Sequence, residues 1–168
     1  MPAEPDFDPI PVLVRFTDAG VDFVVIGGVA GGAHGSIYAT ADVDLAYSRA
    51  LENLERISAL LRELDARLRG APRDLPFQLD ARSLQEGGNF TFETSLGSID
   101  ILAFPAGAPP YDQLRKDAKL IEADGRQVRI ASLDHLIAMK EAAGRPKDLL
   151  AASELRELSD EISQRGGT

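Results

Sequence analysis

The sequence predicts a mixed α+β domain, and three observations support this. Short apolar runs of strand length, such as Val21–Ile26, are rich in β-branched residues and are closed by glycines or turns. Other segments carry apolar residues at steps of three and four, and Leu51–Leu68 is the clearest of these helical patterns. The length of 168 residues suits one compact domain.

The helical patterns and strand patterns alternate along the chain. The expected helices are Pro11–Ala19, a short Gly-rich one within Val29–Tyr38, Leu51–Leu68, Tyr111–Ala118, Leu133–Ala143 and a last one from Pro146 to about Leu158. The expected strands are Val21–Ile26, Thr40–Tyr47, Phe90–Thr94, Ser98–Phe104, Leu120–Ala123 and Gln127–Ile130. Ser132 can cap the helix over Leu133–Ala143, and Gly144 can end it.

The domain boundaries follow from these patterns. Residues 1–9 are expected to form a loose, proline-rich lead, residues 10–160 a single domain, and residues 161–168 a frayed tail. No apolar stretch approaches the length of a membrane span, and the first residues lack the pattern of a signal peptide, so we expect a cytoplasmic protein.

Composition excludes several kinds of site. The chain has no Cys and two His, which excludes disulfides and Cys-ligated metals and argues against a His-rich zinc site. Its formal net charge of −9 argues against a broad nucleic-acid-coating surface. A local basic groove, or a nucleotide held through metal ions, stays compatible with that charge.

A glycine pair closes the first strand pattern. The segment "GGVAGGAHG" fits neither the dinucleotide-binding fingerprint nor the phosphate-loop pattern, in which Ala33 would stand at the lysine position. Gly27 and Gly28 lie where a strand meets a helix, so their backbone N–H groups can approach a phosphate closely. The alternative is a tight turn that packs strand against helix.

Two acids follow on the next strand pattern. Asp42 and Asp44 are separated by one residue, so on a strand they project from the same face. Adjacent carboxylates repel unless a cation lies between them, and oxygen ligands suit Mg²⁺. The alternative is a solvent-facing strand edge.

A third acid, Asp100, lies between Ile99 and Ile101 on a later strand pattern. If that strand neighbours the first one, three carboxylates converge; they could then hold metal ions and take a proton from an attacking hydroxyl. The alternative is an exposed position on a half-buried strand.

Basic residues gather in the C-terminal half. Lys140 shares a helical stripe with Leu133, Leu136 and Ile137, so its ammonium either reaches the surface or enters a cleft and meets a phosphate. Arg145, Lys147 and Asp148 cluster at the start of the last helix, where an acid also complements the helix dipole. Arg115, Lys116 and Lys119 could line a groove for the acceptor or form a solvated helix face. His34 could contact a nucleotide or have a structural role.

The ordered set of motifs resembles a known family. The stretch "VVIGGVAGGAHGSIYATADVDL" resembles the opening of minimal nucleotidyltransferases of the polymerase-β superfamily. The stretch "LGSIDILAFPAG" is similar to the strand that carries that family's third acid. The stretch "VRIASLDHLIAMKEAAGRPKDLLAASEL" is similar to the C-terminal block of the AbiEii-toxin-like branch. The resemblance covers about Val21 to Leu158 and implies a mixed central sheet flanked by helices, with C-terminal helices.

The resemblance also implies roles for residues. Asp42, Asp44 and Asp100 would be the catalytic and metal-binding carboxylates, and Gly27 and Gly28 would hold the nucleotide triphosphate. Lys140 would match a helix lysine that contacts phosphates, and Asp148 would match the first acid of a K-D-x-x-D segment. The chain departs from the family at Ala151, where a second Asp is frequent, at Ala41 before the acid pair, and at Gly28, which is Ser in one branch.

The implied reaction is transfer of a nucleotide from an NTP, with ATP among the candidates, to an acceptor hydroxyl with release of pyrophosphate. Mg²⁺ or Mn²⁺ would be the cofactor, and the acceptor would be tRNA, a protein or a small molecule. The branch implies a toxin with a cognate antitoxin. The alternative is a non-catalytic nucleotide- or partner-binding module that acts as an antitoxin-like or sensor protein.

Overall fold

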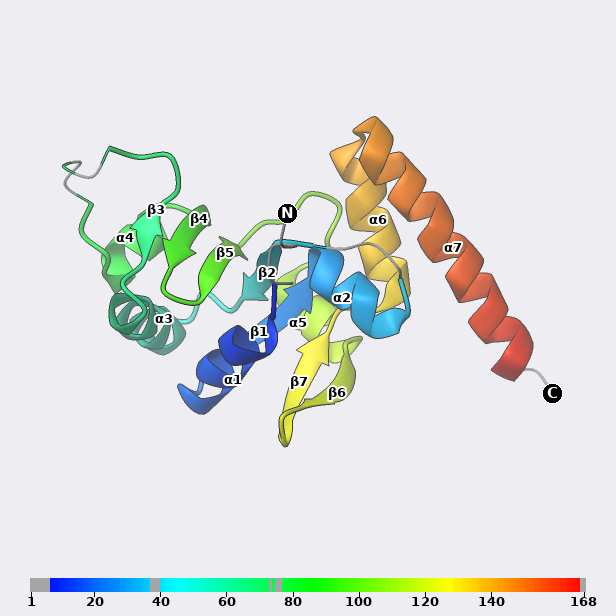
Figure 1. Cartoon of the computed structure of the whole chain (residues 1–168), viewed down its shortest axis with the longest axis horizontal. Coiled ribbons are helices and arrows are strands. Elements are labelled where there is room, and N and C mark those ends of the chain that lie inside the picture. Colours follow the sequence, from blue (N-terminus) through cyan, green and yellow to red (C-terminus); the bar gives the residue numbers. More distant parts are fainter. Residues whose placement is uncertain (1–6, 37–39, 73, 75–76, 167–168) are drawn as a thin grey trace, which may run out of the picture.

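A mixed sheet forms the centre of the protein. The computed structural model describes residues 7–36, 40–72, 74 and 77–166. Within these residues, seven strands form one sheet in the order β3-β4-β5-β2-β1-β7-β6 (Figure 1). The strands are β1 (Phe23–Ile26), β2 (Asp42–Tyr47), β3 (Arg67–Leu68), β4 (Asn89–Thr94), β5 (Gly97–Leu102), β6 (Lys119–Ala123) and β7 (Arg126–Ile130).

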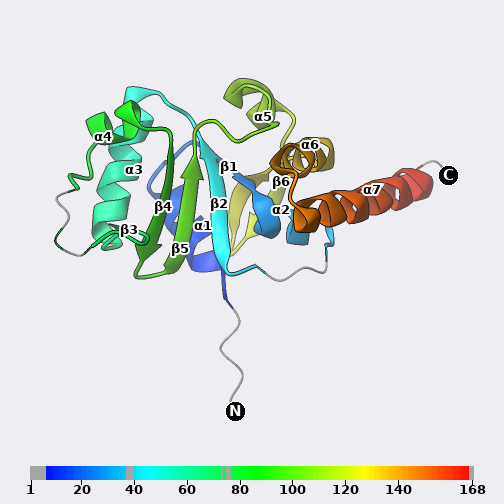
Figure 2. The ribbon, with the colours of Figure 1, turned by 90° about the horizontal axis from the view of Figure 1, so that it is seen from above.

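Helices flank this sheet on both sides. They are α1 (Ile10–Asp18), α2 (Gly27–His34), α3 (Leu51–Glu63), α4 (Ala81–Glu86), α5 (Tyr111–Lys116), α6 (Leu133–Ala143) and α7 (Pro146–Gly166). In Figure 2, α3 and α4 lie beside β4 at one end of the molecule, and α6 and α7 lie at the other end. The α+β class and the mixed sheet with C-terminal helices are therefore confirmed.

The pairing of β2 determines where the acids lie. Strand β2 runs antiparallel to β1 and parallel to β5, so it is a central strand. Its register places Asp44 opposite Asp100 and Asp42 opposite Ser98. Val43 and Leu45 are fully buried on the other face, as the strand alternation predicts.

Helix α3 buries the apolar stripe that its spacing predicts. Leu54, Ile57 and Leu61 are fully buried in the core. The expectation that the helix reaches Leu68 is wrong, because α3 ends at Glu63. Asp65 adopts a left-handed φ of 54°, which no helix accommodates, and the chain then turns into the short strand β3.

Other parts of the structure differ from the expectation or lie outside the described residues. Helix α2 begins at Gly27, before the predicted Val29, and Tyr38 lies outside the described residues. Helix α4 was not predicted; Asp80 caps it by accepting a hydrogen bond from the N–H of Ser83 at 2.8 Å. Of the expected lead over residues 1–9, residues 1–6 lie outside the described part.

The two C-terminal helices follow the predicted caps. Ser132 accepts a hydrogen bond from the N–H of His135, and Gly144 ends α6 with a left-handed φ of 70°. Helix α7 runs to Gly166, well past the expected end near Leu158, because no glycine or proline interrupts the polar residues before that point. In both views its C-terminal half projects away from the sheet (Figures 1 and 2). Within the described residues, no helix has the length and apolarity to cross a membrane.

Candidate active site

The three predicted acids lie on one face of the sheet at a single cavity. The cavity has a volume of about 490 Å³ and includes Asp42, Asp44 and Asp100 in its wall. Asp44 and Asp100 are direct neighbours on parallel strands, and Asp42 projects from the same face one pleat earlier. The structure thus places the three acids on the wall of one cavity with Asp44 next to Asp100, and Asp100 does not point across the sheet.

The pair Asp44 and Asp100 is electrostatically strained. Burial, followed by the negative charge of Asp100, raises the pKa of Asp44 to about 7. When protonated, Asp44 donates a hydrogen bond to Asp100. Burial also raises the pKa of Asp100, although the nearby Arg69 opposes this shift. Two such carboxyls share a proton readily and would exchange it for a cation.

This raised pKa predicts a pH dependence of stability. Asp44 titrates near 3.8 when unfolded and at about 7 when folded, so the folded state retains a proton that the unfolded state releases. The stabilising contribution is complete below the unfolded pKa and is lost as the pH rises through the folded pKa. We therefore expect this contribution to the Tm of the metal-free protein to fall between about pH 4 and about pH 7, measured by thermal unfolding in EDTA. The Asp44→Asn variant should lose this part of the pH dependence, and an identical slope in the variant would contradict the assignment.

The glycine turn packs directly against the acids. Gly27 has a left-handed φ of 68°, and a Cβ atom there would lie 2.9 Å from Cγ of Asp44. A Cβ atom on Gly28 would lie 2.8 Å from Cβ of Thr40, a residue just before β2. Both positions therefore require glycine. The first backbone N–H groups of α2 begin here without a side-chain cap, beside Asp44 on the cavity wall.

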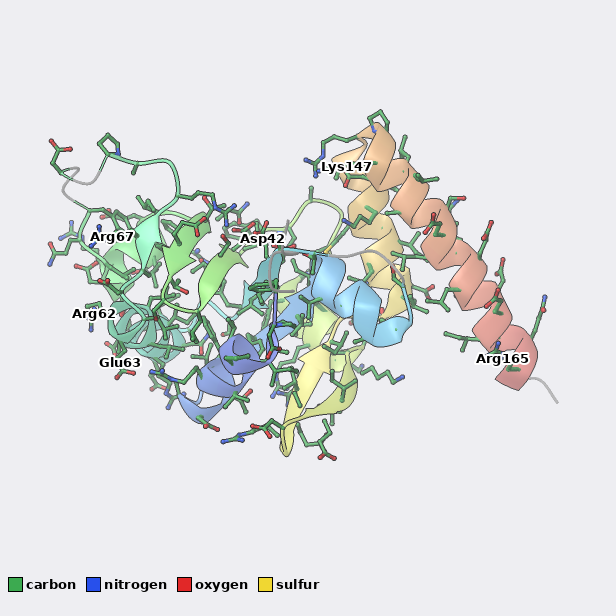
Figure 3. All side chains as sticks on the ribbon, viewed as in Figure 1. Asp42, Arg62, Glu63, Arg67, Lys147 and Arg165 are labelled. Atoms are coloured by element: carbon green, nitrogen blue, oxygen red, sulfur yellow. The ribbon has the colours of Figure 1, made fainter. Side chains whose placement is uncertain are left out.

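Cationic side chains line the opposite wall of the cavity. Lys140 from α6 enters the cavity, as do Arg145 and Lys147 from the corner between α6 and α7. Figure 3 shows Lys147 at this corner and Asp42 across from it at the sheet. Lys140 could have extended to the surface or entered a cleft, and in the structure it lines the cavity. One wall of the cavity thus carries carboxylates beside the first N–H groups of α2, and the other carries cations; such a cavity can bind an anionic group next to a metal ion.

Asp148 holds these cations in place. Its side chain is only 3% exposed, and its Oδ2 atom accepts a hydrogen bond from Nε of Arg145 at 2.6 Å. Its Oδ1 atom lies 3.8 Å from Nζ of Lys140. The bond from Arg145 keeps the pKa of Asp148 below its usual value, so this acid stays ionised. Asp148 lines the cavity, and its contacts favour positioning of the two cations over direct binding of a nucleotide.

The sequence resemblance implies that this cavity binds a nucleotide, and on that expectation the Asp148→Asn variant should bind nucleotides more weakly. The charge-assisted bond to Arg145 is lost, and Lys140 loses its anionic neighbour; such a bond contributes about 1.5–3 kcal/mol. We expect an increase of about tenfold in the Kd for an NTP, measured by fluorescence titration, and a lower Tm. Asp160→Asn, at an exposed position on the same helix, is the control. Unchanged NTP affinity in Asp148→Asn would contradict the positioning role.

Several weaker candidates lie outside the cavity wall. Arg115 pairs with Asp22 at 3.1 Å, and Lys116 and Lys119 do not line the cavity. His34 lies 2.8 Å from the carbonyl oxygen of Ala131, which ties the end of α2 to the chain before α6. Ala151, the departure from the family segment, does line the cavity, so the missing acid lies within the site.

Arg69 is a site residue that the sequence did not reveal. Its Nη2 atom lies 3.0 Å from Oδ1 of Asp100 and 3.8 Å from Oδ1 of Asp42. Arg69 directly follows the short strand β3. In the sequence, Leu68 of β3 continues the leucine spacing of α3, so no local pattern indicates that Arg69 reaches the site.

The acids fit a magnesium ion as a pair. Among the described residues, no three His, Cys, Asp or Glu side chains are grouped closely enough to hold a metal ion together. The convergence of three carboxylates is therefore incomplete, and Asp42 has Arg69 beside it. Mg²⁺ commonly takes one or two carboxylates and completes its shell with water and substrate phosphate oxygens. Asp44 and Asp100 offer such a pair of oxygen ligands beside the cavity.

Comparison with known proteins places the fold. The chain matches no protein-family model and no curated protein sequence. Among solved structures, it resembles the lincosamide antibiotic adenylyltransferase LnuA with lincomycin bound, at a TM-score of 0.59 and 12% identity over 88% of this chain and 94% of that one. It also resembles a Thermotoga maritima protein described as a nucleotidyltransferase, TM1012, at a TM-score of 0.54 and 16% identity over 90% and 89% of the two chains.

A further similar structure is ANT(2'')-Ia in complex with adenylyl-2''-tobramycin. The TM-score is 0.51 and the identity 17%, over 93% of this chain and 95% of that one. These likenesses span nearly the whole length of each protein. The chain therefore has the fold of the nucleotidyltransferases.

Proposed function

We propose that the protein is a divalent-metal-dependent nucleotidyltransferase that moves a nucleotide from an NTP to an acceptor hydroxyl. The observation that carries this proposal is the cavity in which Asp44 and Asp100 meet beside a glycine turn and opposite Lys140. The chain also has the nucleotidyltransferase fold, and one of the solved structures that it resembles, LnuA, is described as an adenylyltransferase.

The triphosphate would lie between the glycine turn and the cations. The N–H groups at Gly27 and Gly28 can approach phosphate oxygens because no Cβ atom intervenes, and Lys140 offsets the negative charge from the facing wall. Arg145 and Lys147 extend this positive wall toward the corner of α6 and α7. The apolar side chains of Leu150, Ala151 and Leu155 also line the cavity and offer a surface for the nucleotide base.

The carboxylates would serve the reacting atoms. Asp44 and Asp100 would hold the metal ion, with Asp42 as the third acid. When bound, this ion supplies Lewis-acid stabilisation of charge on the phosphate oxygens. The acceptor oxygen bonds to the α-phosphorus as the bond to pyrophosphate breaks, and Asp100 takes the acceptor's proton. The protein mainly orients groups and provides electrostatic stabilisation.

A small-molecule hydroxyl is the acceptor that we propose to test first. Two of the solved relatives are described with an antibiotic or an adenylylated antibiotic bound. The negative net charge of this chain also disfavours a large RNA footprint. The AbiEii-like branch, a toxin role and a cognate antitoxin remain predictions from the sequence resemblance.

Incubation with labelled NTPs tests the proposal. The purified protein would be combined with Mg²⁺ or Mn²⁺ and each α-labelled NTP, ATP first. Lincomycin, tobramycin, total tRNA or a cell lysate would be added as the acceptor source. We expect transfer of label to one acceptor class, with release of pyrophosphate, and no transfer by Asp44→Asn.

The outcomes distinguish the two functions considered. Label on a small molecule, an RNA or a protein would identify the acceptor class. NTP binding without transfer to any acceptor would favour the non-catalytic binding module. Absence of both NTP binding and transfer would refute the nucleotidyltransferase and the nucleotide-binding form of the module, and would leave the partner-binding form.

A further inference from the structure

Arg69 bridges the acids of the site from an edge of the sheet. Its backbone N–H donates to the carbonyl oxygen of Thr91 at 2.9 Å, and Thr91 is opposite Asp100 on β5. Arg69 therefore extends the strand row that contains Asp44 and Asp100, although it comes from a distant part of the chain. Its guanidinium lies 3.0 Å from Asp100 and 3.8 Å from Asp42.

A second pair of side chains holds this guanidinium from the far side. Nε of Arg69 donates to Oε1 of Glu93 at 2.8 Å, and the hydroxyl of Ser98 donates to the same carboxylate. Ser98 is paired with Glu93 across β4 and β5, and with Asp42 across β5 and β2. The strand register thus sets the position of Glu93, and the carboxylate of Glu93 holds the guanidinium of Arg69 next to Asp42 and Asp100.

The placement of charge explains why a cation is needed here. Asp42, Asp44 and Asp100 lie on one face of two adjacent strands, so their charges repel one another. Lys140 lowers the energy of an ionised Asp44 from the cavity side, whereas Arg69 reaches Asp42 and Asp100 from the sheet side. A divalent ion bound by the same acids would lie within a few ångströms of the guanidinium and would be repelled by it.

We propose that Arg69 is a tethered counter-cation: it neutralises Asp42 and Asp100 in the metal-free protein and competes with the divalent ion for them. This inference rests on the proposed metal-binding function of the acids. In this proposal the positive charge of Arg69 lowers the affinity of the acids for the metal ion. Glu93 holds the guanidinium of Arg69 in position. Asp42 and Asp100 would gain full access to the metal ion as the guanidinium withdraws.

The test compares Mn²⁺ binding by the metal-free parental protein and by the metal-free Arg69→Gln variant. Binding is measured from the decrease in the electron paramagnetic resonance signal of free Mn²⁺. Removal of one positive charge near a divalent ion in a partly exposed site should tighten Mn²⁺ binding by about tenfold. The same variant should have a lower Tm in EDTA, because the acids lose a counter-charge, and a larger Tm increase on addition of Mn²⁺.

Two further variants separate charge from shape. Arg67→Gln removes an exposed arginine near the same edge, which Figure 3 shows well away from Asp42, and should leave Mn²⁺ affinity unchanged. Arg69→Lys keeps the charge but not the forked contact with Glu93 and Asp100, so its Mn²⁺ affinity should lie between those of the parental protein and Arg69→Gln.

The inference would be overturned by equal or weaker Mn²⁺ binding in Arg69→Gln, or by an equal gain in Arg67→Gln. Weaker binding would make Arg69 a support for the metal ligands. If the parental protein and Arg69→Gln both failed to bind Mn²⁺, the proposed metal site would fail as well, so the two failures are distinguishable.

Discussion

The Asp44→Asn variant should lose the proposed nucleotidyl transfer by at least about a thousandfold, because the metal ion that we propose Asp44 holds would supply several kcal/mol of transition-state stabilisation. At the same time, the metal-free variant should be as stable as the parental protein or more stable near neutral pH. The substitution keeps the shape of the side chain and removes the charge that burial and Asp100 disfavour. Loss of activity together with retained stability is the signature of an electrostatically strained functional group.

Two measurements establish that signature. Transfer from labelled NTP gives the rate, and thermal unfolding in EDTA gives the stability. Asp42→Asn should also lose transfer while it keeps the fold, whereas Glu55→Gln, on the exposed face of α3, should change neither quantity. Near-parental turnover by Asp44→Asn would show that Asp44 does not hold the proposed metal ion, and near-parental turnover by Asp42→Asn would show that the reaction does not need the third acid.

The Gly27→Ala variant should lose activity through the backbone. Its left-handed φ of 68° is unfavourable for alanine, and the added methyl group would meet the carboxylate of Asp44. Strain of this kind costs about 1–3 kcal/mol, and any relief requires movement of Asp44 or of the first turn of α2. We expect a lower Tm and a decrease in transfer of about a hundredfold, because a small displacement of a catalytic group has that effect.

Gly32→Ala is the matched control within the same helix. Gly32 lies in the interior of α2, and a Cβ atom there would meet nothing within 4 Å. Alanine is the better helix former by about 0.5–1 kcal/mol, so this variant should keep its activity and gain slightly in Tm. Equal losses in the two variants would show that α2 tolerates no substitution and would remove the specific role of Gly27.

Much of the site was predictable because it depends on local periodicity. The two-residue spacing of Asp42 and Asp44 requires only that the segment is a strand, and the alternating apolar residues Val43 and Leu45 indicate the buried face. The caps of α6 at Ser132 and Gly144 were likewise readable, since each depends on a few adjacent residues. The neighbourhood of Asp100 depended on the family resemblance, because no local pattern decides which strands pair.

The remainder depends on tertiary contacts that local sequence does not encode. Arg69 reaches the acids only because β3 pairs with β4, and β3 is too short to show alternation. Asp148 at the start of a helix has a sufficient local explanation in the helix dipole, which concealed its contacts with Arg145 and Lys140. The early end of α3 follows from the left-handed Asp65, whereas the leucine spacing continues through Leu68.

The parallel pairing of β2 with β5 has a consequence for how the protein is made. Helix α3, strand β3, helix α4 and strand β4 all lie between the two strands in the chain, so a long loop must close before Asp44 meets Asp100. During synthesis the first acids leave the ribosome while their partner is still unmade. Formation of such non-local strand pairs is slow compared with formation of helices. Helices α1 to α4 precede β5 in the chain and depend on local contacts, so they can form before Asp44 and Asp100 are brought together.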